Sequence, residues 1–508
     1  MRRGDIQGAF VLGLATAGVV LLGFAVSVSA EVVRDGPEFQ INTIEIERQG
    51  LPSSDSVPHG GFVVVWGGDE GLDPELGYVG IHAQRLDTRG VRVGTEFLVS
   101  PPTFERPDVG HDISHVAVHD DASFVVVWDG GGLDGSFKGV FAQRYDASAV
   151  AVDSYFTVNT YTTNQQYRSV VAATGGGEFV VAWLDAGYFS ATGTNIFGQR
   201  FDCDGARVGA EFPIPGTTAG IPIIPMVAGL GSREFVATWT ALNADGDDEV
   251  FAQRFDASGK VGPEILVNTY TTQNQRHADV VGSSDGRFLV AWHSVGQDGD
   301  GNGIFAQQFD STGERDGSEF QVNQYTTGDQ DRPKPAFAPD GSFVVVWTSI
   351  GQDGDARGVF ARRYLTDGTA DGDEFQVNTY TTGAQGGDRF GNGVDISIDD
   401  LGRILVVWES EHGDSTLDGI VGQMFCVDPP ASPVVCGNPT CAGAPAGGGS
   451  DVTIADALAA LQGAVGLREC PACRCDVNGS GRVTTTDALA VLGVATGQQS
   501  ELGCPVCE

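Results

Sequence analysis

The chain has 508 residues, a length that suits two or three domains, and its 41% hydrophobic and 19% charged residues are typical of a globular protein rather than a disordered one. Its formal net charge of −38 at pH 7 argues against nucleic acid as a partner, because such a surface would repel phosphates. The 73 glycines indicate many turns.

The first 30 residues have the features of a signal peptide. Arg2 and Arg3 precede an apolar run over 9–28. The stretch 28–30, "VSA", offers small residues for a signal peptidase, and we expect cleavage after Ala30. The alternative is an uncleaved membrane anchor, since about 20 apolar residues can span a bilayer. The prediction is a secreted, extracellular protein, which could also associate with the cell surface, with no membrane span after cleavage. Cysteines are expected to pair in that compartment.

Seven repeats follow the signal peptide. Each contains an apolar run closed by a tryptophan, and the seven runs are "FVVVW" at 62–66, 124–128 and 343–347, "FVVAW" at 179–183, "FVATW" at 235–239, "FLVAW" at 288–292 and "ILVVW" at 404–408. A run that is apolar at every position predicts a strand buried on both faces, and each unit holds four candidate strands. We therefore predict a mainly β fold, a seven-bladed β-propeller over 31–426, in which the tryptophans pack between blades. A β-sandwich array or a solenoid is the alternative.

The phase of the repeats predicts how the ring closes. The stretch 253–268, "QRFDASGKVGPEILVN", predicts a strand, a tight turn and a strand, so each "EF" strand should pair with the strand that precedes it in the chain. The "EF" strand at 38–43 has no preceding blade, and the last blade has no following "EF" strand. We predict that 38–43 completes the sheet that contains Trp408.

The phrases "EFQVNTYTT" (374–382), "FVVVW" and "GVFAQRYD" (139–146) resemble the β-propeller-like repeats of large secreted and surface proteins of bacteria. This resemblance implies a fold and says little about function.

One acidic loop of the repeats is a candidate for a second metal site. Asp298, Asp300 and Asn302 have the alternate spacing of oxygen ligands for calcium. The alternative is that these residue types simply favour turns.

Catalytic motifs are missing from the sequence, and we predict no catalytic residue. There is no nucleophile elbow, zinc-protease motif or phosphate loop. His111, His115 and His119 share a strand face, and we expect ordinary surface histidines rather than a metal site. Propeller glycosidases need two converging carboxylates, which a sequence with 67 acidic residues does not exclude.

Residues 427–450 are rich in Pro, Gly and Ala and predict a linker, and 451–508 predict a small Cys-rich helical domain. Within it, "DVNGSGRVTTTD" has the oxygen spacing of an EF-hand-type Ca²⁺ loop, and its expected ligands are Asp476, Asn478, Ser480, Arg482 (through its carbonyl), Thr484 and Asp487. The alternative is a polar turn with Asp487 as a helix cap. The related first half of the domain lacks the ligand residues, so we expect one calcium ion.

The duplicated loop-and-helix units over about 445–500 resemble the dockerin type I domain. That resemblance implies a cohesin-like or other surface protein as partner, contacted through Thr485 and Thr486.

Eight of the nine cysteines lie near or in this domain, and we expect disulfides, with zinc binding by the Cys-x-x-Cys pairs as the alternative. They are Cys426, Cys436, Cys441, Cys470, Cys473, Cys475, Cys504 and Cys507. The ninth, Cys203, lies apart from them in the turn "FDCDG" and is not assigned to a disulfide.

The functional expectation is a secreted, non-catalytic binding or display propeller for a glycan or protein ligand, with a calcium-binding module for docking or surface attachment. One alternative is an extracellular polysaccharide-degrading hydrolase, a glycoside hydrolase or lyase, which predicts converging carboxylates at one mouth of the ring. The other is a structural cell-surface protein.

Overall fold

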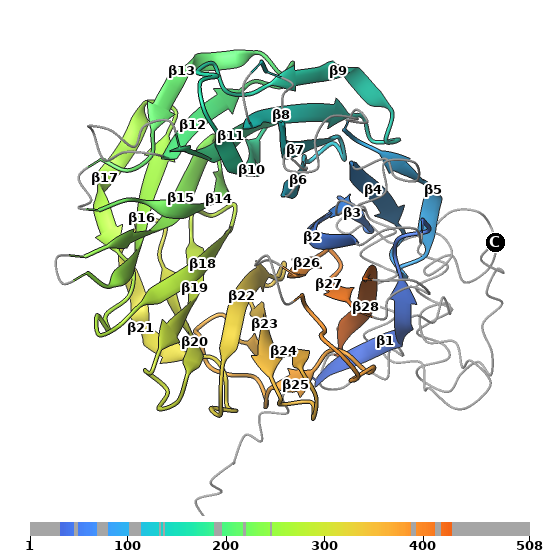
Figure 1. Cartoon of the computed structure of the whole chain (residues 1–508), viewed down its shortest axis with the longest axis vertical. Helices are drawn as coiled ribbons and strands as arrows, with labels where there is room; N and C mark the ends of the chain where they lie inside the picture. Colours follow the sequence, from blue (N-terminus) through green and yellow to red (C-terminus); the bar gives the residue numbers. More distant parts are fainter. Residues whose placement is uncertain are drawn as a thin grey trace, which may run out of the picture.

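The computed structural model describes residues 31–428 except the segments 45–48, 69–79, 101–112, 132–133, 136–137, 187–195, 217–219, 244–245, 388–392 and 412–417. The described residues form seven four-stranded antiparallel sheets, which surround a central axis as the blades of a propeller (Figure 1). The predicted seven-bladed propeller is confirmed. No helix in this part of the chain is long and apolar enough to cross a membrane. The helical domain predicted at 451–508 lies outside the described residues.

In six blades the strands run outward from the axis in chain order, and in the seventh the last three described strands do so while the first strand of the chain is the outer one. The innermost strands are β2 (Gln49–Ser56), β6 (Ser114–Val118), β10 (Gln166–Gly175), β14 (Ile223–Gly231), β18 (Gln275–Gly282), β22 (Gln330–Phe337) and β26 (Val394–Ile398). The second strands are β3 (Phe62–Gly68), β7 (Phe124–Gly131), β11 (Glu178–Asp185), β15 (Glu234–Leu242), β19 (Phe288–Val295), β23 (Phe343–Ile350) and β27 (Arg403–Ser410). The third strands are β4 (Ile81–Leu86), β8 (Lys138–Tyr145), β12 (Ile196–Phe201), β16 (Asp248–Asp256), β20 (Asn302–Phe309), β24 (Arg357–Tyr364) and β28 (Gly419–Asp428). The outer strands are β5 (Arg92–Leu98), β9 (Ala151–Thr157), β13 (Arg207–Pro213), β17 (Gly259–Leu266), β21 (Arg315–Gln321), β25 (Phe375–Gln376) and β1 (Glu31–Gln40).

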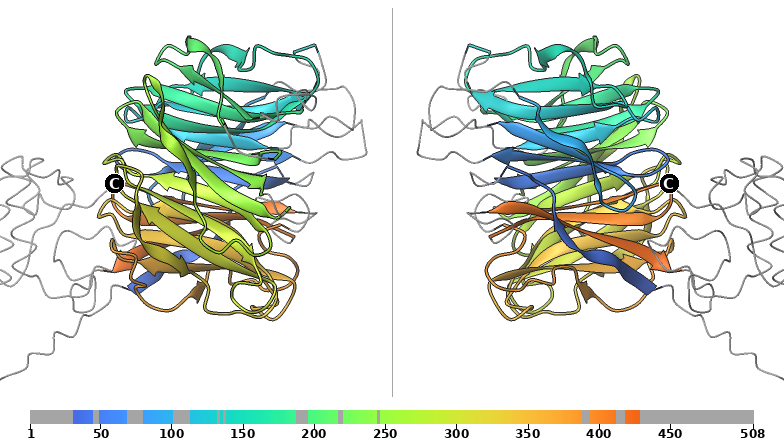
Figure 2. Two further views of the ribbon diagram at one scale, coloured as in Figure 1. Left: turned by 90° about the vertical axis from the view of Figure 1, so that its left-hand side faces the viewer. Right: turned by 90° about the vertical axis from the view of Figure 1, so that its right-hand side faces the viewer.

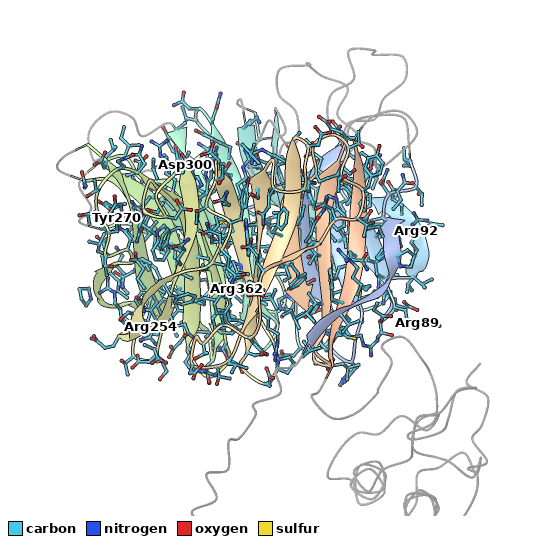
Figure 3. The ribbon with its side chains drawn as sticks, turned by 90° about the horizontal axis from the view of Figure 1, so that it is seen from below. Arg89, Arg92, Arg254, Tyr270, Asp300 and Arg362 are labelled. Carbon is cyan, nitrogen blue, oxygen red and sulfur yellow. The ribbon has the colours of Figure 1, made fainter. Side chains whose placement is uncertain are left out.

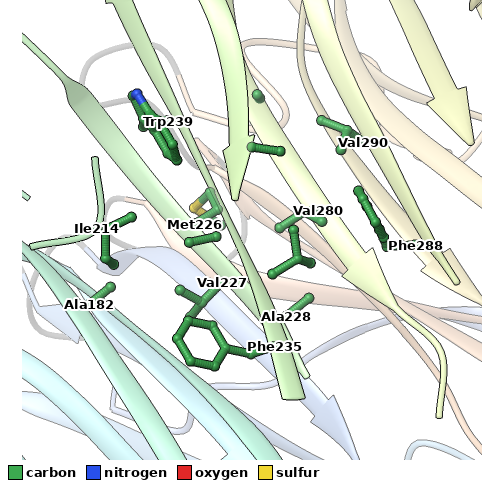
Figure 4. Packing of buried hydrophobic residues seen from close by; sticks show 14 of the residues in the cluster. Ala182, Ile214, Met226, Val227, Ala228, Phe235, Trp239, Val280, Phe288 and Val290 are labelled. Atoms are coloured by element: carbon green, nitrogen blue, oxygen red, sulfur yellow. The ribbon is translucent and has the colours of Figure 1, made fainter. Parts of the chain in front are cut away.

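The core lies between neighbouring blades. All seven tryptophans at the ends of the apolar runs are at most 1% exposed, as predicted for residues that pack between blades. In Figure 4, Met226 and Trp239 of one blade lie near Val280 and Val290 of the next. Because each second strand has a blade on both of its faces, both of its faces are apolar, which explains the non-alternating runs.

The ring closes as predicted. β1 pairs with β28 from Glu31↔Asp428 to Gln40↔Val421, in the sheet that also contains β27 and Trp408. Figure 2 shows β1 and β28 side by side. Arg92 of β5, labelled in Figure 3, adds a second tie, because its Nε donates to the carbonyl of Ile41, 2.9 Å away, just after β1. Because β1 supplies the fourth strand of the last sheet, β28 is paired on both sides and is not an exposed edge strand at the seam.

The glutamate of the repeated "EF" phrase also joins six of the seven outer strands to the preceding blade, and β9, which has Tyr155 at this position, is the exception. The carboxylate of Glu319 accepts hydrogen bonds from the backbone amide and the hydroxyl of Thr269, at 2.6 and 2.9 Å. At the seam, Glu38 accepts in the same way from the amide of Thr379. The glutamate therefore repeats because it satisfies a backbone donor between blades, and not because it binds a ligand.

Candidate active site in the central channel

A cavity of about 780 Å³ lies on the axis of the ring and is lined by the innermost strands of all seven blades. It extends to the hairpin turns that join innermost to second strands, where Asp120, Gly176 and Arg233 line it. Neighbouring innermost strands approach closely there: a Cβ at Gly229 would lie 2.0 Å from the carbonyl oxygen of Ala173, so only glycine fits.

One register position places five of the polar side chains of this cavity. In each blade it is the residue that pairs with the one before the tryptophan, as in Asp279↔Ala291 and Asp395↔Val407. The blades thus contribute one residue each at the same depth, and the polar ones are Ser53, His115, Asp279, Lys334 and Asp395. All five line the cavity.

Lys334 pairs with one of these carboxylates and interacts electrostatically with a second. Its Nζ lies 2.7 Å from Oδ2 of Asp279 on the neighbouring blade, and both side chains are mostly buried. Burial alone would lower the pKa of Lys334, but the charges of Asp279 and Asp395 outweigh it and raise that pKa. The ammonium group is therefore a fixed positive charge between two carboxylates at the centre of the channel.

Asp395 is held across the seam of the ring. Its Oδ2 accepts from the backbone amide of Ser54, at 2.7 Å, and from the Ser54 hydroxyl, at 3.4 Å. Burial raises the pKa of Asp395 to about 6, against the opposing effects of Lys334 and the Ser54 amide. At neutral pH this carboxylate is mostly ionised.

Asp55, two residues beyond Ser53 on β2, brings a third carboxyl group into the cavity. Its two oxygens accept from the amides of Val118 and Ser56, each at 2.8 Å. Burial raises its pKa to about 7 despite these hydrogen bonds, and the charge of Asp395 raises it further. At neutral pH Asp55 is therefore protonated in about half of the molecules.

His115 and His119 are not ordinary surface residues, so that expectation is wrong. His115 lies on the innermost strand β6 and His119 directly follows that strand, so both line the cavity. Burial lowers the pKa of His115 to about 3, with a further contribution from Lys334, so its ring is neutral. His111 lies outside the described residues.

A smaller cavity of about 40 Å³ adjoins the large one. Ser53, His115, Lys334 and Asp395 line both cavities. The small cavity lies toward the opposite end of the innermost strands, where Arg168 and His277 complete its wall.

The candidate calcium loop of the propeller is tied by its own hydrogen bonds. Asp298 Oδ2 accepts from Asn323 Nδ2 at 2.9 Å, Asp300 (Figure 3) accepts from a backbone amide at 3.0 Å, and Asn302 donates to Asp331 at 2.8 Å. In the described part of the chain, no group of three or more His, Cys, Asp or Glu side chains could hold a metal ion. These contacts explain the loop residues without a metal, and calcium binding there stays a prediction.

The other predicted site residues belong to the C-terminal region. The calcium-loop residues Asp476 to Asp487, with Thr485 and Thr486, lie outside the described residues, as do the cysteines from Cys436 onward. Cys426 lies on β28, and Cys203 is an exposed free thiol in a turn. The calcium site, the disulfides and the docking surface therefore stay predictions.

No protein-family model and no curated protein sequence matches the chain. Solved structures share its fold at low identity. A protein of unknown function from Dyadobacter fermentans is 12% identical, with a TM-score of 0.47 over 78% of this chain and 99% of that one. An α-L-arabinanase of Penicillium chrysogenum is 13% identical, with a TM-score of 0.42 over 65% and 97%. An α-L-arabinofuranosidase of Fusarium graminearum is 9% identical, with a TM-score of 0.40 over 77% and 98%.

The expectation of a non-catalytic binding or display propeller is wrong, and the carboxylates in the channel favour the hydrolase alternative over it. The similar structures include several arabinanases and arabinofuranosidases, although likeness at such identities is a likeness of fold. The correction therefore depends on the channel itself, where Asp55, Asp279 and Asp395 line one cavity. Converging carboxylates were the feature that the hydrolase alternative predicted.

Proposed function

We propose that the chain is an extracellular glycoside hydrolase that acts on a polysaccharide, with its active site in the central cavity. The observation that carries the proposal is the pair Asp55 and Asp395, which come from different blades, line one cavity and have pKa values raised to about 7 and about 6. Two interacting carboxyl groups with different pKa values can supply one acid and one base at neutral pH.

Asp55 has the features of the general acid. With a pKa near the working pH it can be protonated and still donate readily, and it would give its proton to the glycosidic oxygen as the bond to the anomeric carbon breaks. The leaving sugar departs as an alcohol.

Asp395 is the partner carboxylate. It is mostly ionised at neutral pH, and the Ser54 amide fixes one of its oxygens. It would either take a proton from the attacking water or attack the anomeric carbon itself, and the configuration of the released sugar distinguishes these two routes. Lys334, which Asp279 holds in an ion pair, acts on Asp395 through its charge and favours the ionised form of that carboxylate.

A panel of polysaccharides tests the proposal. The full chain and its Asp55→Asn variant are incubated with arabinan, xylan, galactan and homogalacturonan, and released reducing ends are measured. The proposal predicts cleavage of at least one glycan and a rate 10²–10⁴-fold lower in the variant, the range for a lost general acid. Asp316→Asn, which changes an exposed acid on β21, is the matched control. No cleavage of any glycan, or equal rates in wild type and Asp55→Asn, overturns the proposal.

The C-terminal region enters the proposal as an attachment module. The spacing from Asp476 to Asp487 supports one bound Ca²⁺, and the likeness to dockerins supports docking to a cohesin-like or other surface protein. A hydrolase attached in this way would stay close to its polysaccharide.

A further inference from the structure

The small cavity next to the carboxylates has two cationic side chains in its wall, Arg168 and Lys334, in an otherwise acidic protein. Arg168 on β10 and His277 on β18 line it beside Lys334 and Asp395 (strands in Figure 1). The chain as a whole carries a net charge of −38, so a cluster of basic side chains on the axis is unusual for it. Its position, sharing a wall with the candidate active site, suggests a role in substrate binding.

Arg168 has no partner of its own. Its side chain is half-buried, and among the residues that the structure describes it makes no hydrogen bond or ion pair. Next to it, the buried Nδ1 of His277 also lacks a hydrogen-bond partner in this part of the chain. A guanidinium group offers five donors in one plane, and leaving them without an acceptor in a buried site costs free energy. A ligand with acceptor oxygens would satisfy them.

The neighbouring charges do not neutralise Arg168. The carboxylate of Asp279 is 2.7 Å from Lys334, and that of Asp331 is 3.0 Å from Arg357 and 3.3 Å from His293. Asp395 is the acid that shares the small cavity, and Lys334 lies between it and Asp279. Burial, and then the electrostatic effects of His293 and Arg332, lower the pKa of His277 to about 3, so its ring is neutral and does not compete with Arg168 for an anionic group.

The backbone does not require arginine at this position. Arg168 lies at a register shift of its innermost strand with a positive φ of 56°, and four other blades have the same shift and a positive φ at Leu51, Ile224, His277 and Arg332. Since leucine and isoleucine form the same bulge, the basic side chain of Arg168 is a property of the site and not of the fold.

The size of the small cavity limits what can enter it. A volume of about 40 Å³ exceeds the ~10–15 Å³ that one water needs, but it is far smaller than the neighbouring 780 Å³. It suits one substituent of a sugar whose ring occupies the large cavity. A planar carboxylate matches the planar fork of arginine in a bidentate pair.

We infer that the Arg168 pocket binds the carboxylate of an acidic sugar, so that the substrate of this chain is a uronate-containing polysaccharide. The inference rests on the proposed function for the position of the sugar ring, but the pocket can be tested by binding alone. Sulfated sugars share the negative charge and are a separate arm of the test.

Calorimetry on the full chain tests the inference, with Asp55→Asn present throughout to prevent cleavage. The ligands are a galacturonate oligomer, its methyl ester and a sulfated galactan oligomer. We expect the galacturonate to bind at least about tenfold more tightly than the ester, the effect of a hydrogen-bonded charge. Arg168→Leu should remove this preference, and Arg168→Lys should keep part of it. Arg89→Leu removes the same charge from an exposed turn between β4 and β5 and should keep all of the preference.

Leucine already occupies the equivalent bulge at position 51, so Arg168→Leu is expected to fold, and its melting curve checks this. Equal affinity for acid and ester, or a preference that survives in Arg168→Leu, overturns the inference. Binding of the sulfated oligomer without binding of galacturonate overturns the uronate assignment. If the chain prefers the acid but the wild type cleaves no glycan, the uronate pocket is supported and the hydrolase proposal is contradicted. If cleavage depends on Asp55 but the acid is not preferred, the hydrolase proposal is supported and the uronate pocket is contradicted.

Discussion

The backbone amide of Ser54, on the innermost strand of the first complete blade, donates a 2.7 Å hydrogen bond to Oδ2 of Asp395, on the innermost strand of the last. The two residues are 341 positions apart. The same contact therefore joins the ends of the ring and fixes one of the candidate catalytic carboxylates. Closure of the propeller and assembly of the site are thus linked, and changes at the seam should affect both.

The first prediction concerns that seam. A chain that begins at Asn42 lacks β1, which leaves β28 as an unpaired edge and exposes the apolar surface that Phe39 covers. We expect a large loss of thermal stability and concentration-dependent association, measured by calorimetry and light scattering. A chain that begins at Glu31 is the control and should match the full chain. Equal melting of the two shortened chains would show that β1 does not close the ring.

The second prediction concerns the asparagine that follows five of the seven outer strands, at positions 42, 159, 268, 323 and 378. The side chain of Asn323 is buried, and its Oδ1 accepts from the amide of Ile304 at 2.7 Å while its Nδ2 donates to Asp298 and to the carbonyl of Tyr325, both at 2.9 Å. Asn323→Ala leaves these groups unpaired and should lower the free energy of unfolding by about 2–4 kcal/mol. Denaturant unfolding measures this, with Gln324→Ala as an exposed neighbour for comparison. A loss below about 0.5 kcal/mol, typical of an ordinary surface change, would contradict this role.

The third prediction is a pH dependence of stability. The pKa of Asp55 is raised from 3.8 to about 7 by folding, so the folded state binds more protons than the unfolded state between these values. The contribution of Asp55 to stability therefore falls as pH rises from about 4 to 7. Asp55→Asn removes this dependence, so variant minus wild-type stability should increase over that range by on the order of 1–3 kcal/mol and then level off. Thermal unfolding from pH 4 to 8 measures it, and a constant difference would contradict the raised pKa.

The fourth prediction concerns calcium. If the loop from Asp476 to Asp487 binds Ca²⁺, the Asp476→Ala, Asp487→Ala double variant should lose the binding that calorimetry detects in the wild type. Asp298→Ala is the comparison, because the hydrogen bonds of Asp298 already account for its position. Binding that survives the double variant and disappears with Asp298→Ala would move the site to the propeller.

Much of the fold follows from local patterns. The repeated run that ends in Trp128 or Trp347 needs a sheet on each of its faces, and the "EF" strand at 38–43 needs a partner, so blade number and closure could be predicted. The tryptophan runs can be recognised within a single repeat. The closure follows from the order of the strands, because the first "EF" strand has no preceding blade in the chain.

The site could not be predicted in the same way. Asp55, Asp279 and Asp395 belong to three blades and to unrelated local sequences, and they meet only because the ring brings the innermost strands together. One signal was available: Asp279 and Asp395 pair with the residue before a tryptophan. Aligning the repeats on their tryptophans would have placed these two carboxylates at one depth, with Lys334 at the same depth on the blade between them, because Lys334 also pairs with the residue before a tryptophan.

The central claim is that Asp55 and Asp395 act as an acid and base pair, and the pH dependence of kcat/KM on the cleaved polysaccharide tests it most directly. The account predicts a bell-shaped profile, with an acid limb near pH 6 as Asp395 ionises and an alkaline limb near pH 7 as Asp55 loses its proton. Asp55→Asn should lose the alkaline limb together with most of the rate. A wild-type profile that stays flat from pH 5 to 8, or an alkaline limb that persists in Asp55→Asn, would contradict the account.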